Sequence, residues 1–403
     1  MKKTLWMLGI AVTALTSCTQ NEVLDVHESR KIQFDPFVGK NTRLAMPINQ
    51  AQNSNYTGTA PLDNLFQFWV YGTEDGSTKF DGTEETARVF YSNSLNGFTY
   101  NNHLTWDLGN SYFFAAYSNG NYPLLKTGSA ELNTEVNNNN VSSVSFSEIK
   151  QDGEVIGTQL FIDDYQIGSL DLLAATTEKI TPTDNTLDPV PFNFAHMLSL
   201  IVIELKNEHK DLYFQIDPLT FQGIKKDDCA YIYTLEGNSK SVVWENIFPD
   251  LKDTTEDEDD PTIGDYEFIG TNNGIEEDQL SDDPEDYVGP GQSLRMVYFV
   301  IPQDNSDLKA EGNKDIILKV QTYHYDKETN SFSLAIANSD PEEYKVSLAI
   351  TDETHNVWQP GYLYNYKAVL SGDAHFIHFT ASVDDWKDKQ YPVGSSIISS
   401  SSN

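Results

Sequence analysis

The stretch FNFAHMLSLIVIEL, residues 192–205, points to a β-sheet protein. Phe192 and Phe194 alternate with polar or small neighbours, and a run of leucine and β-branched residues follows from Ser199 to Leu205; both patterns are typical of strands. Four other stretches are similarly rich in β-branched and aromatic residues: 65–71, 112–117, 295–301 and 316–325. Glycine, asparagine, aspartate and serine clusters separate such stretches, and no helical periodicity persists over 15 residues. The sequence therefore predicts an all-β protein built from sandwiches.

The length of the chain and a proline-rich connection predict two domains. At roughly 150 residues per domain, a chain of 403 residues holds two or three. Residues 176–191 carry three prolines and no apolar alternation, so we place a boundary near residue 185. The expected units are an N-terminal β-sandwich over 44–185, a C-terminal β-sandwich over 186–394 and a frayed, serine-rich tail over 395–403.

The net charge of the chain limits the classes of molecule that it can bind. The chain has 26 Lys and Arg against 61 Asp and Glu, a net charge of −35. Such a surface repels phosphate backbones and excludes nucleic acid as a partner. An aromatic content of 12% argues against a disordered acidic chain. Residues 253–287 hold 15 Asp or Glu and no Lys or Arg, which predicts a long, solvated acidic loop in the second domain.

The amino terminus has the features of an export signal. Residues 1–17 combine Lys2 and Lys3 with an apolar core of signal-peptide length. They lead into Leu15-Thr16-Ser17-Cys18, which resembles a bacterial lipobox and implies an acyl anchor on Cys18 in the outer membrane. The sequence has two cysteines, so a lipidated Cys18 leaves Cys229 without a disulfide partner, and we expect it to be a small buried residue.

Motifs for catalysis or metal binding do not emerge. The acidic loop lacks EF-hand spacing, and His375 and His378 point to opposite faces of an expected strand. No HExxH, GxSxG or phosphate-binding glycine loop occurs, so we expect no enzyme, cofactor or metal site. A glycosidase pair of carboxylates has no sequence spacing to recognise. His196 lies in an apolar strand and is expected in the core, as are the tryptophans beside strand patterns: Trp69, Trp106, Trp244, Trp358 and Trp386.

Eight features follow one another along the chain: the lipobox at Cys18, KIQF at 31–34, NTRL at 41–44, FQFWVYG at 66–72, Trp106 with YFFAAY at 112–117, FAHMLS at 194–199, WQPGYLYNY at 358–366 and FTASVDDW at 379–386. In this order they resemble the fimbrillin family, the pilin and pilin-like lipoproteins of Bacteroidetes that include the Mfa-like group. The resemblance covers most of the chain, and its specificity lies in the order of the motifs.

The resemblance implies two tandem transthyretin-like β-sandwich domains and a mode of assembly. In such pilins an arginine-specific protease removes the first strand, and a donor strand from another fimbrial subunit fills the groove. Here the implied cut lies between Arg43 and Leu44, within a lipidated segment spanning 18–43. Ile32 and Phe34 on its first strand are expected to complete the core of the N-terminal sandwich.

A donor strand should alternate apolar residues, and here the pattern is weak. The candidate residues are Tyr391, Val393, Ile397 and Ile398, interrupted by Gly394-Ser395-Ser396. The sequence therefore leaves a stem, tip or anchor role in cell-surface fimbriae open, as well as a lipoprotein that never polymerises. The alternative from another class is a surface glycan-binding lipoprotein, which would need exposed aromatic platforms and no processing.

Overall fold

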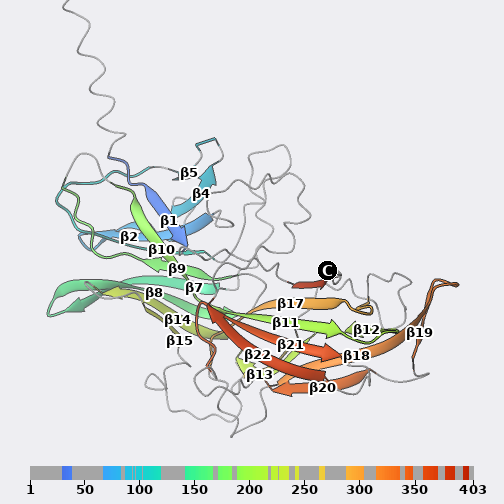
Figure 1. Ribbon diagram of the computed structural model, residues 1–403. Coiled ribbons are helices and arrows are strands. Elements are labelled where there is room, and N and C mark those ends of the chain that lie inside the picture. Colours follow the sequence, from blue (N-terminus) through green and yellow to red (C-terminus); the bar gives the residue numbers. More distant parts are fainter. Residues whose placement is uncertain are drawn as a thin grey trace, which may run out of the picture.

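The computed structural model describes residues 30–38, 67–82, 87–92, 94–95, 97–101, 103–118, 141–166, 171–183, 188–216, 219–225, 227–235, 241–244, 263–267, 287–303, 315–335, 341–347, 357–370, 377–385 and 394–398. These residues form strands β1 to β23 and contain no α-helix, which confirms the all-β prediction (Figure 1). None of them belongs to a helix long and apolar enough to span a membrane.

The N-terminal unit consists of two sheets. The first sheet runs in the order β1 (Phe34–Val38), β10 (Val190–His196), β9 (Leu173–Thr176), β6 (Tyr112–Ser118), β2 (Gln67–Glu74), β4 (Arg88–Ser92) and β5 (Gly97–Tyr100), with β3 (Ser77–Asp81) paired to β2. The second sheet runs in the order β15 (Ser241–Trp244), β14 (Asp227–Leu235), β8 (Glu154–Gln166) and β7 (Val141–Gln151).

Strand alternation gives the first sheet two different faces. One face lines an aromatic interior that includes Phe68, Phe114 and Phe192. The other face carries Tyr71 and Ala115 into a second core, which the first sheet shares with β8 and β14 of the second sheet. A period of two therefore sends neighbouring residues of one strand into two separate cores.

The C-terminal unit also has two sheets. The third sheet runs in the order β22 (Ile377–Asp385), β21 (Tyr362–Leu370), β11 (Ser199–Asn207), β17 (Ser293–Val300) and β23 (Gly394–Ile398). The fourth sheet runs in the order β12 (Leu212–Ile216), β18 (Asp315–Asp326), β13 (Thr220–Lys225) and β16 (Ile263–Glu267), with β19 (Ser331–Leu334) and β20 (Glu342–Ser347) paired to β18. Aliphatic residues of β11 such as Ile201 and Ile203 pack in its core beside rings such as Phe221 and Trp358.

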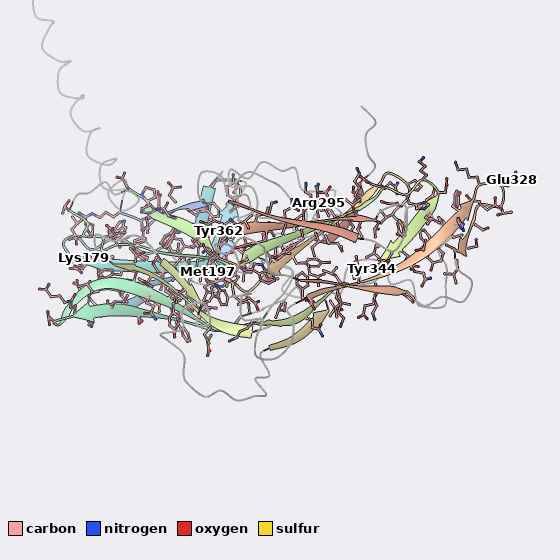
Figure 2. The ribbon with its side chains drawn as sticks, turned by 60° about the horizontal axis from the view of Figure 1, so that its bottom comes forward. Lys179, Met197, Arg295, Glu328, Tyr344 and Tyr362 are labelled. Atoms are coloured by element: carbon pink, nitrogen blue, oxygen red, sulfur yellow. The ribbon has the colours of Figure 1, made fainter. Side chains whose placement is uncertain are left out.

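The two units share a continuous core at their junction. Met197 and Leu198 connect β10 of the first sheet to β11 of the third, and both are fully buried. The indole Nε1 of Trp244 in the second sheet donates a hydrogen bond of 2.6 Å to the carbonyl oxygen of Met197. Figure 2 shows Met197 between the units, with Lys179 toward one end of the elongated molecule and Glu328 at the other.

The sheets correct the predicted domain boundary. Residues 176–191 connect β9 to β10, which pair directly in the first sheet, so the break near residue 185 lies inside the N-terminal unit. Beyond 186, β14 and β15 also return to this unit by pairing with β8. Prolines mark a long connection, but a long connection can return to its own sheet, whereas the actual crossing at Met197-Leu198 is short and carries no turn residues.

Two further segments differ from expectation. Within the predicted acidic loop 253–287, residues Ile263–Glu267 form β16, which pairs with β13; apart from these and Tyr287, the loop lies outside the described residues. Gly394–Ile398, mostly assigned to a frayed tail, form β23 along β17. Both short strands are held by long-range pairing, which local composition does not reveal.

Candidate functional site

Residues 30–38, called the first-strand segment below, lie between two walls of backbone. On one side β1 pairs in parallel with β10, from Phe34 opposite Val190 to Val38 opposite Phe194. On the other side the amide of Ile32 donates to the carbonyl oxygen of Leu104 at 2.9 Å. The space between β10 and residues 103–106 is called the slot. The second wall thus holds residues 30–32, while β10 holds Phe34–Val38 as the terminal strand of the first sheet.

The inward face of the first-strand segment is apolar. Ile32, Phe34 and Pro36 are buried, whereas Gln33 and Asp35 between them are exposed. Ile32 and Phe34 therefore lie in the core, on the face that strand alternation assigns to them. Full burial of two such side chains stabilises the folded state by about 3–6 kcal/mol.

Phe34 lies at the centre of the aromatic interior. Five rings surround it, with centroids 5.5 to 6.5 Å from its own: Phe68, Phe80, Tyr100, Phe114 and Phe192. Gly72 on β2 makes room for this packing, since a Cβ there would lie 2.7 Å from the Phe114 ring and 3.1 Å from Phe80. Edge-to-face and stacked ring pairs add about 0.5–1.5 kcal/mol each beyond area burial. The sheet is thus built around a large aromatic side chain from the first-strand segment.

Tyr100 joins the segment to its second wall. Its hydroxyl donates to the carbonyl oxygen of Ile32 at 2.9 Å and accepts from the amide of Leu104 at 3.1 Å. Burial raises the pKa of the Tyr100 hydroxyl to about 12, against a smaller lowering by the hydrogen bond from Leu104. The hydroxyl therefore keeps its proton, and with it the donor function, at neutral pH.

A buried carboxylate anchors the residues that follow the second wall. Glu74 accepts hydrogen bonds from the hydroxyl of Tyr112 and, at 2.9 Å, from Asn110, and it forms an ion pair with Lys79. Burial alone would raise the pKa of the Glu74 carboxyl, but the hydrogen bonds from Lys79, Tyr112 and Asn110 outweigh burial and lower it to about 2. Tyr112 also accepts from the Asp107 amide at 2.7 Å, so this cluster fixes the chain just beyond the slot.

The predicted processing and donor residues are only partly described. Cys18, Arg43, Leu44, Tyr391 and Val393 lie outside the described residues. Ile397 and Ile398 lie in β23, where their backbones pair with Leu294 and Ser293 of β17. The structure thus brings Ile32 and Phe34 together in the slot and places the described part of the donor segment on the C-terminal unit.

Sequence reasoning missed Tyr100 and Leu104 as partners of the first strand. Both are some 70 residues from Ile32, and pairing over such a distance leaves no periodic signal. The one residue of this wall that the sequence singled out was Trp106. Its amide donates to the carbonyl oxygen of Arg30 at 2.9 Å. Its indole packs edge-to-face on Tyr112, with ring centroids 4.7 Å apart.

The other candidate sites in the described residues are structural. Trp106, Trp244 and Trp358 are buried, and the half-buried Trp69 stacks on Tyr117, so these four supply no open aromatic platform; Trp386 is outside the described residues. No group of three or more potential metal ligands occurs in the described part of the chain.

His196 and Cys229, which the sequence placed in the core, each have a polar partner that is buried or partly buried. His196 is a core histidine whose Nδ1 lies 2.6 Å from Asp171 Oδ2, and burial raises the pKa of the Asp171 carboxyl. Cys229 is half-buried rather than fully buried, and its thiol donates to Asp163 Oδ1 at 3.2 Å. Both contacts satisfy polar groups within the fold.

Comparison with known proteins identifies a family. The fimbrillin-like family model matches residues 56–386. A fimbrial protein from Bacteroides vulgatus is similar in structure at 14% identity and a TM-score of 0.43, covering 89% of this chain and 100% of its own. A fimbrial assembly protein from Parabacteroides distasonis has 12% identity and a TM-score of 0.30, covering 82% of this chain and 94% of its own. The tip fimbrial protein Mfa3 from Porphyromonas gingivalis has 10% identity and a TM-score of 0.31, covering 80% of this chain and 95% of its own. No curated protein sequence matches the chain.

Proposed function

This chain belongs to the fimbrillin-like family, and on that premise we propose that it is a structural or accessory (tip or anchor) subunit of cell-surface fimbriae that supports adhesion. It is exported as a lipoprotein and held in the outer membrane by an acyl chain on Cys18. An arginine-specific protease hydrolyses the peptide bond between Arg43 and Leu44, leaving a carboxylate on Arg43 and an amine on Leu44. A strand from another fimbrial subunit then replaces the first-strand segment.

The observation that carries this proposal is the way the slot holds the first-strand segment, with residues 30–32 bonded to one wall and Phe34–Val38 paired to the other. Residues 30–38 are one short piece of chain, and their two walls, β10 and residues 103–106, belong to the body beyond residue 66. A cut between this segment and β2 severs it covalently while every described strand stays intact. Its removal would leave unpaired amide and carbonyl groups on both walls, which an incoming strand satisfies.

The distribution of arginines supports Arg43 as the cleavage position. The sequence contains four: Arg30, Arg43, Arg88 and Arg295. Arg88 lies within β4 and Arg295 within β17, and the carbonyl oxygen of Arg30 is hydrogen-bonded to Trp106. Proteases bind extended chain, which residues held in a sheet cannot offer without local unfolding. A cut at Arg30 would also leave Ile32 and Phe34 in the slot, whereas a cut at Arg43 frees them.

Cleavage would couple release from the membrane to opening of the slot. The acyl chain on Cys18 and the first-strand segment lie on the same side of Arg43, so one hydrolysis separates both from the body. An uncleaved copy keeps its slot filled and stays at the membrane, while a cleaved copy is competent to accept a donor.

The test combines surface protein with matched arginine variants. Protein taken from cell surfaces should start at Leu44 and be recovered in complexes with other fimbrial subunits, and digestion of the purified precursor with an arginine-specific protease should give the same amino terminus and a body able to form such complexes. Arg43→Ala should block both, whereas Arg30→Ala should block neither. Oligomers formed by the Arg43→Ala variant, or surface protein that starts at Cys18 throughout, would contradict the mechanism.

The anchor has its own control. A fatty-acid probe should label the wild-type precursor but not Cys18→Ala, because the lipidated atom is the thiol sulfur of Cys18. Cys229→Ser should be labelled like the wild type. Equal labelling of Cys18→Ala and wild type would refute the anchor without touching strand exchange.

A further inference from the structure

We infer that the emptied slot selects its occupant by side-chain pattern and takes a strand from a different subunit, not residues 387–398 of a second copy. The occupant presents an aliphatic residue at the site of Ile32, a large aromatic ring at the site of Phe34 and a small apolar residue at the site of Pro36. The inference rests on the proposed function, since the slot opens only when the first-strand segment leaves.

The site of Phe34 demands an aromatic ring. Phe68, Phe80, Tyr100, Phe114 and Phe192 face it within 6.5 Å, and they come from five different strands. Rings fixed on several strands of one sheet cannot all collapse onto a smaller side chain, so serine or alanine there leaves a cavity. This site is therefore the main determinant of which strand the slot accepts.

The two flanking sites exclude charge. Ile32 is fully buried, with its amide bonded to Leu104 and its carbonyl oxygen to Tyr100, and Pro36 is buried beside β10. An ammonium group at either position would leave water among apolar neighbours, at a cost of several kcal/mol unless it is paired. An acceptable strand must therefore be apolar at three alternate positions.

This chain's candidate donor segment fails that pattern in both directions. Tyr391 is the single aromatic residue in 387–398, so it alone could fill the site of Phe34. If the segment runs in the direction of β1, Lys389 falls at the site of Ile32. If it runs in the opposite direction, Val393 fits the site of Ile32, but Lys389 falls at the site of Pro36. Each direction places a lysine at a buried apolar site, so a second copy is a poor donor.

The experiment measures displacement of the cleaved first-strand fragment by synthetic peptides. Full-length precursor is cut after Arg43, and native mass spectrometry follows loss of the fragment. A peptide of residues 30–38 should exchange into the slot, and its Phe34→Ala version should bind at least about 100-fold more weakly. A peptide of residues 387–398 should not exchange, whereas its Lys389→Val version should.

The outcomes separate this inference from the proposed function. Displacement by the unmodified 387–398 peptide equal to that by the 30–38 peptide, or oligomers from the cleaved chain alone, would overturn the inference and leave strand exchange standing. Equal binding of the Phe34→Ala and unmodified 30–38 peptides would also overturn it. Failure of every peptide to enter the slot would contradict strand exchange, and the inference with it.

Discussion

Strands β1 and β23 are both short segments near the ends of the described chain, yet the fold holds them differently. The first-strand segment is bonded to one wall through residues 30–32 and to β10 through Phe34–Val38, and it inserts Ile32 and Phe34 into the aromatic interior. Strand β23 pairs with β17 alone, at the outer edge of the third sheet. The two segments therefore differ in their second-wall contacts and in the side chains they bury rather than in strand length.

The two cores explain why these contacts matter. Around β11 the core mixes leucine, isoleucine and valine with rings such as Phe221, Trp358 and Tyr366. Around β1 it is made of large rings that meet at Phe34. A subunit that is to lose one strand and gain another benefits from such a core, because the empty slot is unstable and strongly favours a matching replacement.

Phe34→Ala should give the largest effect. It removes the ring at the centre of the aromatic interior and should lower the free energy of unfolding of the N-terminal unit by about 3–5 kcal/mol. Asp35→Ala, one residue away on the exposed face, should change it by less than about 0.5 kcal/mol. Urea unfolding followed by tryptophan fluorescence measures both. A loss below 1 kcal/mol for Phe34→Ala would mean that β1 is no more essential than an edge strand.

Glu74→Gln tests the carboxylate cluster beyond the second wall. Hydrogen bonds to a charged group contribute about 1.5–3 kcal/mol, so the variant should lose stability of that order at pH 7. Because the folded pKa of Glu74, about 2, lies below its ordinary value of 4.5, the wild-type advantage is fully present above pH 4.5. It should disappear as pH falls from 4.5 toward 2.

The readout is the urea midpoint of both proteins across this pH range. The exposed Glu154→Gln serves as the control for removing one negative charge from a strongly acidic chain, and it should show no such convergence with wild type. An advantage that grows on acidification would show that Glu74 is not ionised in the folded protein.

Tyr100→Phe and Tyr364→Phe compare the two units through one chemical change. Each hydroxyl accepts from a backbone amide and donates to a carbonyl oxygen: Leu104 and Ile32 for Tyr100, Gln359 and Val357 for Tyr364. Each variant leaves partly or fully buried backbone groups unsatisfied and should cost about 1–3 kcal/mol.

The two variants should differ in their effect on release of the cleaved first-strand fragment. Tyr100→Phe should speed hydrogen exchange of the amides in 31–38 and release of the cleaved first-strand fragment, because its hydroxyl holds Ile32. Tyr364→Phe, at a similar cost in stability, should change neither. If both variants speed release equally, loss of overall stability rather than loss of the Tyr100 contact controls the slot.

The sequence predicted what is local and missed what is paired over distance. Alternation through Ile32 and Phe34 indicated the inward face of the first strand, and β-branched runs located β11 and β18. The second wall of the slot was not predictable, because Tyr100 and Leu104 contact Ile32 through long-range hydrogen bonds. Such contacts leave no periodic pattern in the sequence. The prolines near 182–191 suggested a domain boundary, yet Phe192 and Phe194 on β10 complete the aromatic interior of the first unit.

Hydrogen exchange in the intact chain gives the smallest and most direct test of the comparison. Backbone hydrogen bonds of β23 contribute about 0.5–1.5 kcal/mol each, while ordering each residue costs about 1–2 kcal/mol, so its pairing with β17 should be close to balanced. The amides of Ser395–Ile398 should therefore exchange by local detachment, at least about 10-fold faster than those of Ile32 and Trp106, which bond the first-strand segment to its second wall. The latter should exchange only when the N-terminal unit opens, and Phe34→Ala should accelerate them while leaving β23 unchanged. Equal protection of the two sets of amides, or slower exchange in β23, would show that pairing along one side suffices to hold a strand in this protein.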